Sequence, residues 1–267
     1  MPLPDVEVRS AGRTFTKRAG PDRGREYVAL ENVSFSISSG EFLCLLGPSG
    51  CGKSTLLRMV AGFLPPSAGE VLVRGEPVKG PGMDRAVVFQ GDAALFNWLT
   101  TEENVEFGLR MRGLPLAQRR RIVADNIRLV GLEGFEHHHP NQLSGGMRQR
   151  VQIARVLAND PAILLMDEPF GALDAQTRMV MQNDLQTLSL EAGATIVFVT
   201  HDITEAVLLA DHVVVLSQRP SRLLANIPID LPRPRNMFEP FRNAGFEAAY
   251  DAVWTEFRSQ IDIGRAH

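Results

Sequence analysis

Residues 41–61 read EFLCLLGPSGCGKSTLLRMVA, and they carry the strongest indication of the fold. An apolar run at 42–46 suits a buried strand, and residues 54–61 have the periodicity of a helix. Between them lies Gly-x4-Gly-Lys-Ser, the P-loop pattern, in which glycines let successive backbone N–H groups turn toward phosphate oxygens. A chance glycine-rich turn is the alternative, and the flanking strand and helix count against it. The stretch predicts a nucleoside triphosphate site.

The same loop supplies the groups that a triphosphate and its metal require. A helix that begins near Lys53 presents its positive N-terminal end to an anion. Lys53 is expected to reach the β- and γ-phosphates, and the Ser54 hydroxyl to help hold Mg²⁺. The residues expected to bind ATP here are Gly47, Pro48, Ser49, Gly50, Cys51, Gly52, Lys53, Ser54 and Thr55.

The composition is that of an ordinary globular protein. With 267 residues, of which 44% are hydrophobic and 22% charged, one large domain or a core with a subdomain is expected. A net charge of −3 gives no electrostatic reason to expect nucleic acid. Cys44 and Cys51 make no disulfide framework, residues 1–5 do not begin like a signal peptide, and no apolar run reaches ~18 residues. Any membrane role is expected to come through a partner.

Strands and helices alternate along most of the chain, which predicts an α/β fold. Residues 5–37 alternate apolar and polar side chains around a loop at 18–26 and predict antiparallel strands. From about residue 92 to 160 the periodicity is helical, so a helical subdomain is expected as an insertion. Strands are then expected at 162–166, 195–200 and 213–217, with helices at 174–192 and 203–210, which favours a parallel sheet with right-handed crossovers. We predict an ATPase domain over 5–227 and a peripheral tail over 228–267.

Two carboxylates follow a predicted strand. Residues 163–168 read ILLMDE, and ligands of parallel sheets bind beyond the carboxyl ends of the strands. Asp167 can hold Mg²⁺ there through water, and Glu168 can orient or deprotonate an attacking water. Two solvated acids at a strand end are the alternative, and the P-loop upstream argues against it.

Gln90 and His201 also follow predicted strands. The amide oxygen of Gln90 could reach Mg²⁺ or the attacking water, and the chain beyond it leads into the helical insertion. His201 could contact the γ-phosphate and position the water through its imidazole. An ordinary turn residue and a structural histidine remain the alternatives on these residues alone.

A second glycine turn, Leu143-Ser144-Gly145-Gly146-Met147, precedes a predicted helix. Ser144 can cap that helix, and the glycines permit close approach of a phosphate. The P-loop already surrounds one face of the triphosphate, so a second phosphate-binding turn needs another face. A head-to-tail pair of subunits provides one, whereas a cap without a ligand is the alternative.

Together these motifs resemble the full series of ABC-transporter nucleotide-binding subunits, over about residues 5–220. The resemblance implies a RecA-like P-loop NTPase core with an antiparallel β-subdomain and an inserted helical subdomain. The residues it implies for catalysis are Glu168, His201 and Gln90, those for Mg²⁺ are Ser54, Gln90 and Asp167, and those for ATP outside the P-loop are Phe15, Ser144, Gly145, Gly146, Gln149 and Asp174. Phe15 is expected to stack on adenine, with Tyr27 as the alternative.

Other segments resemble the nitrate, sulfonate and taurine importer ATPases: Trp98-Leu99-Thr100, Glu103-Asn104-Val105, and residues 169–174, 214–220 and 230–235. Asn97 stands where those proteins often carry proline, so the loop that faces the permease is expected to differ. The resemblance implies an ATP-hydrolysing subunit of a bacterial importer for a small anion, at the cytoplasmic face of the inner membrane. Its expected partners are a second copy of itself, permease subunits and, indirectly, a periplasmic binding protein. An exporter ATPase or a non-transport ABC ATPase is the alternative.

His137-His138-His139 resembles a metal cluster in composition. Consecutive residues of one loop do not converge easily on a tetrahedral ion, so a solvated loop is expected instead.

Overall fold

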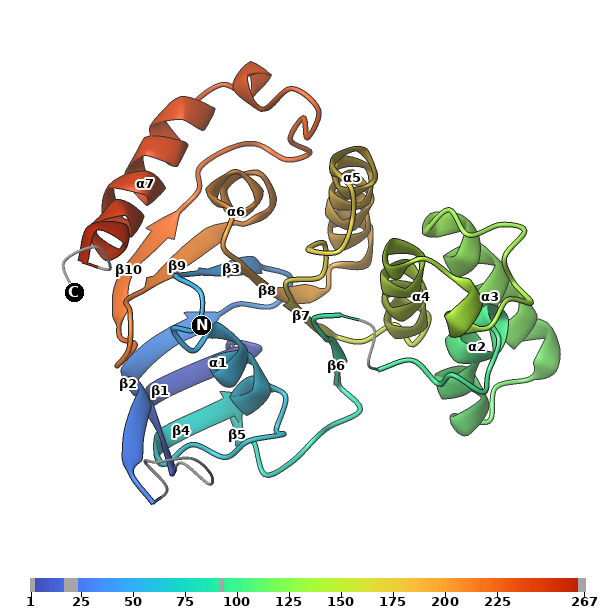
Figure 1. Ribbon diagram of the computed structural model, residues 1–267, viewed down its shortest axis with the longest axis horizontal. Helices are drawn as coiled ribbons and strands as arrows, with labels where there is room; N and C mark the ends of the chain where they lie inside the picture. Colours follow the sequence, from blue (N-terminus) through green and yellow to red (C-terminus); the bar gives the residue numbers. More distant parts are fainter. Residues whose placement is uncertain (1–2, 17–23, 92–93, 264–267) are drawn as a thin grey trace.

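The computed structural model describes residues 3–16, 24–91 and 94–263, and the chain forms two sheets flanked by helices (Figure 1). The larger sheet contains, in spatial order, β10 (Leu223–Pro228), β9 (His212–Leu216), β3 (Phe42–Leu46), β8 (Thr195–Thr200), β7 (Ile163–Asp167) and β6 (Arg85–Val88). All neighbours pair in parallel except β10, which is antiparallel to β9 at the edge. The parallel sheet expected from the strand–helix alternation is therefore present.

The smaller sheet is antiparallel and consists of β2 (Glu26–Ile37), β1 (Val6–Thr16), β4 (Ala68–Val73) and β5 (Glu76–Pro77). Alternate residues of β3 divide between two cores, as side chains of a strand point to opposite faces. Leu43 and Leu45 pack with α1 (Lys53–Val60) and the smaller sheet, whereas Cys44 and Leu46 pack against the helices of the opposite face. Helix α1 is thus enclosed between the two sheets.

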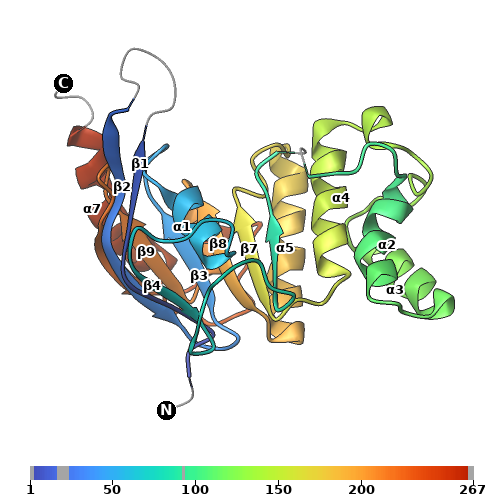
Figure 2. The same cartoon turned by 90° about the horizontal axis from the view of Figure 1, so that it is seen from below.

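Three helices form a unit beside the sheets (Figures 1 and 2). They are α2 (Thr101–Met111), α3 (Leu116–Leu129) and α4 (Gly145–Leu157), and they contact one another. Thr100 and Glu103 close the start of α2 with a reciprocal capping box, in which each side chain accepts a hydrogen bond from the other's backbone N–H. The unit occupies most of the region where the sequence predicts helical periodicity, and a short 3₁₀ turn (Pro140–Gln142) leads into α4.

The remaining helices cover the larger sheet: α5 (Ala175–Ala192), α6 (Ile203–Leu209) and α7 (Phe246–Ile263). The predicted helices at 174–192 and 203–210 are confirmed to within one residue at each end. None of the helices in the described ranges combines the length and hydropathy that crossing a bilayer requires.

The C-terminal segment differs from the predicted peripheral tail. Met237, Phe246 and Val253 are buried in the core on the α5–α6 side of the sheet. Arg235 is 2% exposed and donates to the carbonyls of Val207 and Ala210, at the end of α6. Arginine and proline in this segment suggested an exposed tail, but the guanidinium satisfies carbonyls that the helix end leaves open. The described part beyond residue 228 therefore belongs to the body of the fold.

Candidate nucleotide site

Strand order brings the predicted site residues to one edge of the larger sheet. The register pairs Leu46 of β3 with Thr200 of β8, and Asp167 of β7 with Val199. The strands are parallel, so the residues that follow them emerge side by side. The P-loop follows β3, Glu168 follows β7 and His201 follows β8.

The P-loop turns from β3 into α1 through residues that tolerate unusual backbone angles. Gly50 and Gly52 have φ of 75° and 123°, values that side-chain-bearing residues rarely adopt. Lys53 is 4% exposed, and its Nζ donates to the carbonyl oxygens of Gly47 (2.7 Å) and Pro48 (3.0 Å). The ammonium therefore lies inside the loop that is predicted to surround phosphates, held there by neutral acceptors.

A hydroxyl and a carboxylate meet beside the P-loop. Ser54 Oγ donates to Asp167 Oδ1 at 2.9 Å. Asp167 is 3% exposed, and burial raises its pKa, with the nearby Glu168 charge acting in the same direction and the Ser54 hydrogen bond opposing it. Oxygen donors of these two kinds are those that Mg²⁺ prefers, and a cation beside this carboxylate would offset the cost of its burial. The donor set fits a magnesium ion bound with a nucleotide.

Two side chains contact the same carboxylate oxygen of Glu168. Gln90 Nε2 donates to Glu168 Oε2 at 3.2 Å, and His201 Nδ1 lies 3.5 Å from the same atom. Glu168 itself has a φ of 46°, and its N–H donates to Val199 O at 3.1 Å. Its carboxylate is therefore held at the strand ends by residues that follow β6 and β8, the two strands next to β7 in the sheet. The structure brings Gln90, Glu168 and His201 together, as expected.

Ser144 caps α4, and its Oγ accepts from Met147 N at 3.3 Å. In both ribbon views β7 lies between α1 and α4, so the Ser-Gly-Gly turn and the P-loop belong to separate regions of the chain (Figures 1 and 2). Gln149 is 1% exposed, and its Nε2 lies 3.5 Å from Phe89 O, next to Gln90. The side chain of Gln149 thus contacts its own subunit's β6 connection, and its expected contact with ATP stays a prediction.

Asp174 caps α5 and is exposed. Its Oδ1 accepts from Thr177 N at 2.9 Å, and hydrogen bonds from that backbone lower its pKa. The residue lies one position before the helix, on the connection from β7.

The two aromatic candidates for adenine lie together. Phe15 and Tyr27 are paired across β1 and β2, and their rings stack with centroids 5.7 Å apart. Tyr27 is 36% exposed. The sequence left open whether Phe15 or Tyr27 stacks on adenine. In the structure these two candidates are the members of one stacked pair.

A buried polar cluster next to His201 has no counterpart among the residues predicted from sequence. Glu205 accepts hydrogen bonds from Thr200 Oγ1 and from Gln182 Nε2. Burial raises the pKa of this carboxyl. A glutamate in an otherwise apolar helix is the sequence signal that could have identified it, and the cluster fixes the start of α6 directly after His201.

The three consecutive histidines do not gather around one point. His137 Nδ1 lies 3.0 Å from Glu102 Oε1 on α2. Within residues 3–16, 24–91 and 94–263, no three His, Cys, Asp or Glu side chains are grouped so as to hold a metal ion.

The chain is similar to known proteins over most of its length. Residues 30–171 match the ABC transporter family. The sequence is 54% identical over 233 residues to the taurine import ATP-binding protein TauB of Burkholderia pseudomallei, covering 87% of this chain and 89% of that protein. It is 44% identical over 249 residues to the nitrate import ATP-binding protein NrtC of Synechocystis, covering 92% of this chain and 36% of that protein.

The fold is similar to that of a solved ATP-binding cassette, a dimer in a post-hydrolysis state bound to ADP and Pi. The TM-score is 0.75 at 33% sequence identity, covering 84% of this chain and 98% of that chain. The likeness confirms the RecA-like P-loop fold expected from the sequence.

Proposed function

Because the chain belongs to the ABC transporter family, we propose that it is the ATP-hydrolysing subunit of a bacterial importer for a small anion. The observation that carries this proposal is the convergence of Lys53, the Ser54–Asp167 pair and Glu168 at one sheet edge. Taurine, other sulfonates and nitrate are the candidate substrates, since the similar proteins are named for taurine and nitrate import.

Lys53 and the loop amides bind the triphosphate. The ammonium is held by two neutral carbonyls, so it can exchange them for phosphate oxygens, which are charged and therefore stronger acceptors. The Ser54 hydroxyl and the Asp167 carboxylate, with Gln90, hold Mg²⁺. The ion supplies charge neutralisation of the phosphate oxygens when it is bound.

Glu168 orients and deprotonates the attacking water. Gln90 and His201, which follow the strands on either side of β7, restrain the orientation of the Glu168 carboxylate. Its Oε2 atom therefore has a defined position relative to the P-loop. The side chain of His201 is 61% exposed, and it contacts the γ-phosphate of bound ATP in this proposal. Gln90 transmits the nucleotide state to the helical unit, because the chain after it leads to α2.

Two copies bind two ATP head to tail. The Ser144 turn of one copy covers the triphosphate held by the partner's P-loop, with α4 presenting its N-terminal end. Asp174 lies at the same interface. The solved dimer with ADP and Pi supports this arrangement, and so does the separation of the turn from its own P-loop.

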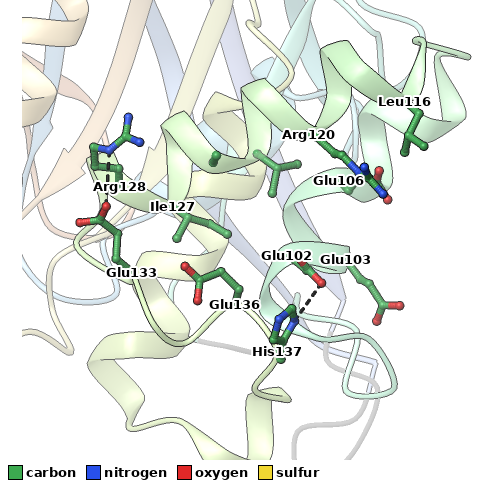
Figure 3. A pocket seen from close by; sticks show the side chains of 12 residues that line it. Glu102, Glu103, Glu106, Leu116, Arg120, Ile127, Arg128, Glu133, Glu136 and His137 are labelled. Atoms are coloured by element: carbon green, nitrogen blue, oxygen red, sulfur yellow. Dashed lines mark hydrogen bonds and ion pairs between the residues drawn. The ribbon is translucent and has the colours of Figure 1, made fainter.

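The permease and the periplasmic binding protein complete the transporter at the cytoplasmic face of the inner membrane. We place the permease on the helical unit, which spans about residues 92–160. A cleft of about 620 Å³ lies there between α2, α3 and the loop after α3 (Figure 3). Five glutamates line it against two arginines and one histidine. They are Glu102, Glu103, Glu106, Glu133 and Glu136, and this excess of negative charge suits a basic permease segment.

The catalytic assignment is tested by comparing ATP turnover of the wild type with Glu168→Gln. Loss of a group that positions or deprotonates the water lowers kcat by ~10²–10⁴-fold. Glu76→Gln, an exposed carboxyl of β5, is the matched control and should retain full turnover. Undiminished turnover of Glu168→Gln would refute the role of this carboxylate.

The substrate is tested with the whole transporter in vesicles. Taurine, other sulfonates and nitrate are each supplied with the binding protein, and stimulation of ATP hydrolysis is measured. No stimulation by any of these anions would refute them as substrates while leaving the ATPase assignment intact.

A further inference from the structure

Arg219 lies between the aromatic pair and the P-loop. Its Cζ is 5.5 Å from the centroid of the Tyr27 ring, and that ring stacks on Phe15. On the other side, a Cβ placed on Gly50 would come within 4.0 Å of Arg219 Nη2. One guanidinium therefore adjoins both the surface predicted to hold adenine and the loop predicted to hold phosphates.

The turn that carries Arg219 is fixed from two directions. It connects β9 to β10 and pairs with β2, since Ser221 N donates to Ala29 O (3.0 Å) and Glu31 N donates to Ser221 O (2.9 Å). On its other flank, Gln218 N donates to Gln260 Oε1 at 3.0 Å, and Gln218 Nε2 donates to Gln260 O at 2.6 Å. Gln260 belongs to α7 and is 7% exposed. The position of Arg219 is therefore set by β2 and by the C-terminal helix.

The charge of Arg219 is directed toward the nucleotide site rather than into an ion pair. Arg222, three residues later in the same turn, donates to Glu31 Oε2 at 2.9 Å. Arg219 is exposed, and among the described residues no carboxylate forms an ion pair with it. A guanidinium is permanently charged, stacks on aromatic rings and binds phosphate oxygens through several N–H groups. These properties match the two surfaces that Arg219 adjoins.

We propose that Arg219 is a nucleotide-binding residue that donates to phosphate oxygens of ATP while stacked on Tyr27, and that Gln260 positions it. The inference rests on the proposed nucleotide site, because it takes the P-loop and the aromatic pair as the two ends of one ligand. It gives the C-terminal helix a role in ATP binding.

The test measures the Kd of ATP, ADP and adenosine by calorimetry and the KM and kcat of ATP hydrolysis. Arg219→Gln should weaken ATP and ADP binding and raise KM by roughly three- to tenfold, with kcat retained, as for one charge-assisted contact at an exposed site. Adenosine, which has no phosphate, should bind both proteins equally. Arg222→Gln removes the same charge from the same turn and should match the wild type.

Gln260→Ala should raise KM in the same direction as Arg219→Gln. In protein that already carries Arg219→Gln, Gln260→Ala should cause no further rise in KM, because Gln260 acts only by positioning Arg219. An unrelated loss of stability would instead lower the apparent kcat in both backgrounds, because it reduces the fraction of folded enzyme. Thermal unfolding of each variant identifies that outcome, and it would overturn the role of Gln260.

Equal ATP affinity of Arg219→Gln and Arg222→Gln would overturn the inference. Lys53→Ala separates this failure from failure of the site itself. If Lys53→Ala abolishes ATP binding and Arg219→Gln does not weaken it, only the proposed role of Arg219 is refuted. If Lys53→Ala binds ATP as the wild type does, the proposed nucleotide site is refuted as well.

Discussion

Ser54 Oγ donates a hydrogen bond to Asp167 Oδ1 at 2.9 Å, although the two residues are 113 positions apart in the sequence. The bond joins the start of α1 to the end of β7 and leaves the carboxylate 3% exposed. Burial raises the pKa of Asp167, so the folded state bears a cost for the charged carboxylate when no cation is bound. This relationship has a consequence for stability as well as for metal binding.

Asp167→Asn should stabilise the nucleotide-free protein at neutral pH by on the order of 1 kcal/mol. Burial raises the pKa of Asp167, so the folded state bears a cost for the charged form at pH values above the folded pKa. That cost declines as the pH falls and disappears below about pH 4, where the carboxyl is protonated in both states. Denaturant unfolding at several pH values measures the difference between the two proteins.

The same variant should lose most of the Mg²⁺ dependence of ATP binding, since an amide is a weaker ligand than a carboxylate. Titration of ATP with and without Mg²⁺ provides this comparison. A variant that is no more stable than the wild type at pH 7, or that retains the full Mg²⁺ effect, would contradict the account of Asp167.

Gln90→Ala and His201→Ala should have effects on kcat that do not multiply. Both side chains reach Glu168 Oε2, so each substitution releases the same carboxylate. We expect each to lower kcat by roughly 10²-fold and the double variant to lose much less than the product. Steady-state turnover gives kcat for the two single variants and for the double variant. His212→Gln is the control for loss of an imidazole, because His212 lies at the start of β9, at the opposite end of the parallel strands. Fully multiplicative effects would indicate separate roles.

Ser144→Asp distinguishes the role of residue 144 as the N-cap of α4 from its proposed contact with the partner's ATP. Aspartate is as good an N-cap as serine, so the free energy of unfolding should stay within about 0.5 kcal/mol of the wild type. Its negative charge would face the partner's triphosphate, so ATP-dependent dimerisation should be lost. Light scattering of Glu168→Gln protein with ATP, with and without the additional substitution, measures this.

Ser144→Ala is the matched comparison for that experiment. It should cost about 1 kcal/mol of stability through loss of the cap while introducing no repulsion. Dimerisation of Ser144→Asp at wild-type strength would argue that the turn does not approach a nucleotide.

Arg235→Leu should destabilise the fold by about 3–5 kcal/mol. The guanidinium donates to the carbonyls of Val207, Ala210, Ile229 and Leu231, and leucine would leave these buried acceptors without a donor. Burial lowers the pKa of Arg235 to about 10, so it remains charged at neutral pH. Denaturant unfolding measures the loss. Arg242→Leu, whose side chain is exposed, should leave stability nearly unchanged, and equal effects of the two would contradict a structural role of Arg235.

Much of the fold follows from the sequence because its signals are local. The strand, turn and helix of the P-loop are consecutive, so apolar periodicity and glycine spacing indicate them without knowledge of the rest of the chain. The same holds for α5 and β8, whose predicted ranges agree with the structure to within one residue. The C-terminal segment differs, because a buried arginine reads as polar in sequence and two of its carbonyl partners, Val207 and Ala210, lie at the end of α6.

The P-loop, the Asp-Glu strand end, the second glycine turn and the strand–helix alternation can be identified from the sequence alone, since each depends on neighbouring residues. Three contacts are visible only in the folded chain: Gln90 and His201 meet at one oxygen of Glu168, Gln149 packs toward its own β6 connection, and Arg219 lies between Tyr27 and Gly50. These contacts depend on strand order and register, which place distant segments side by side and which no local pattern specifies.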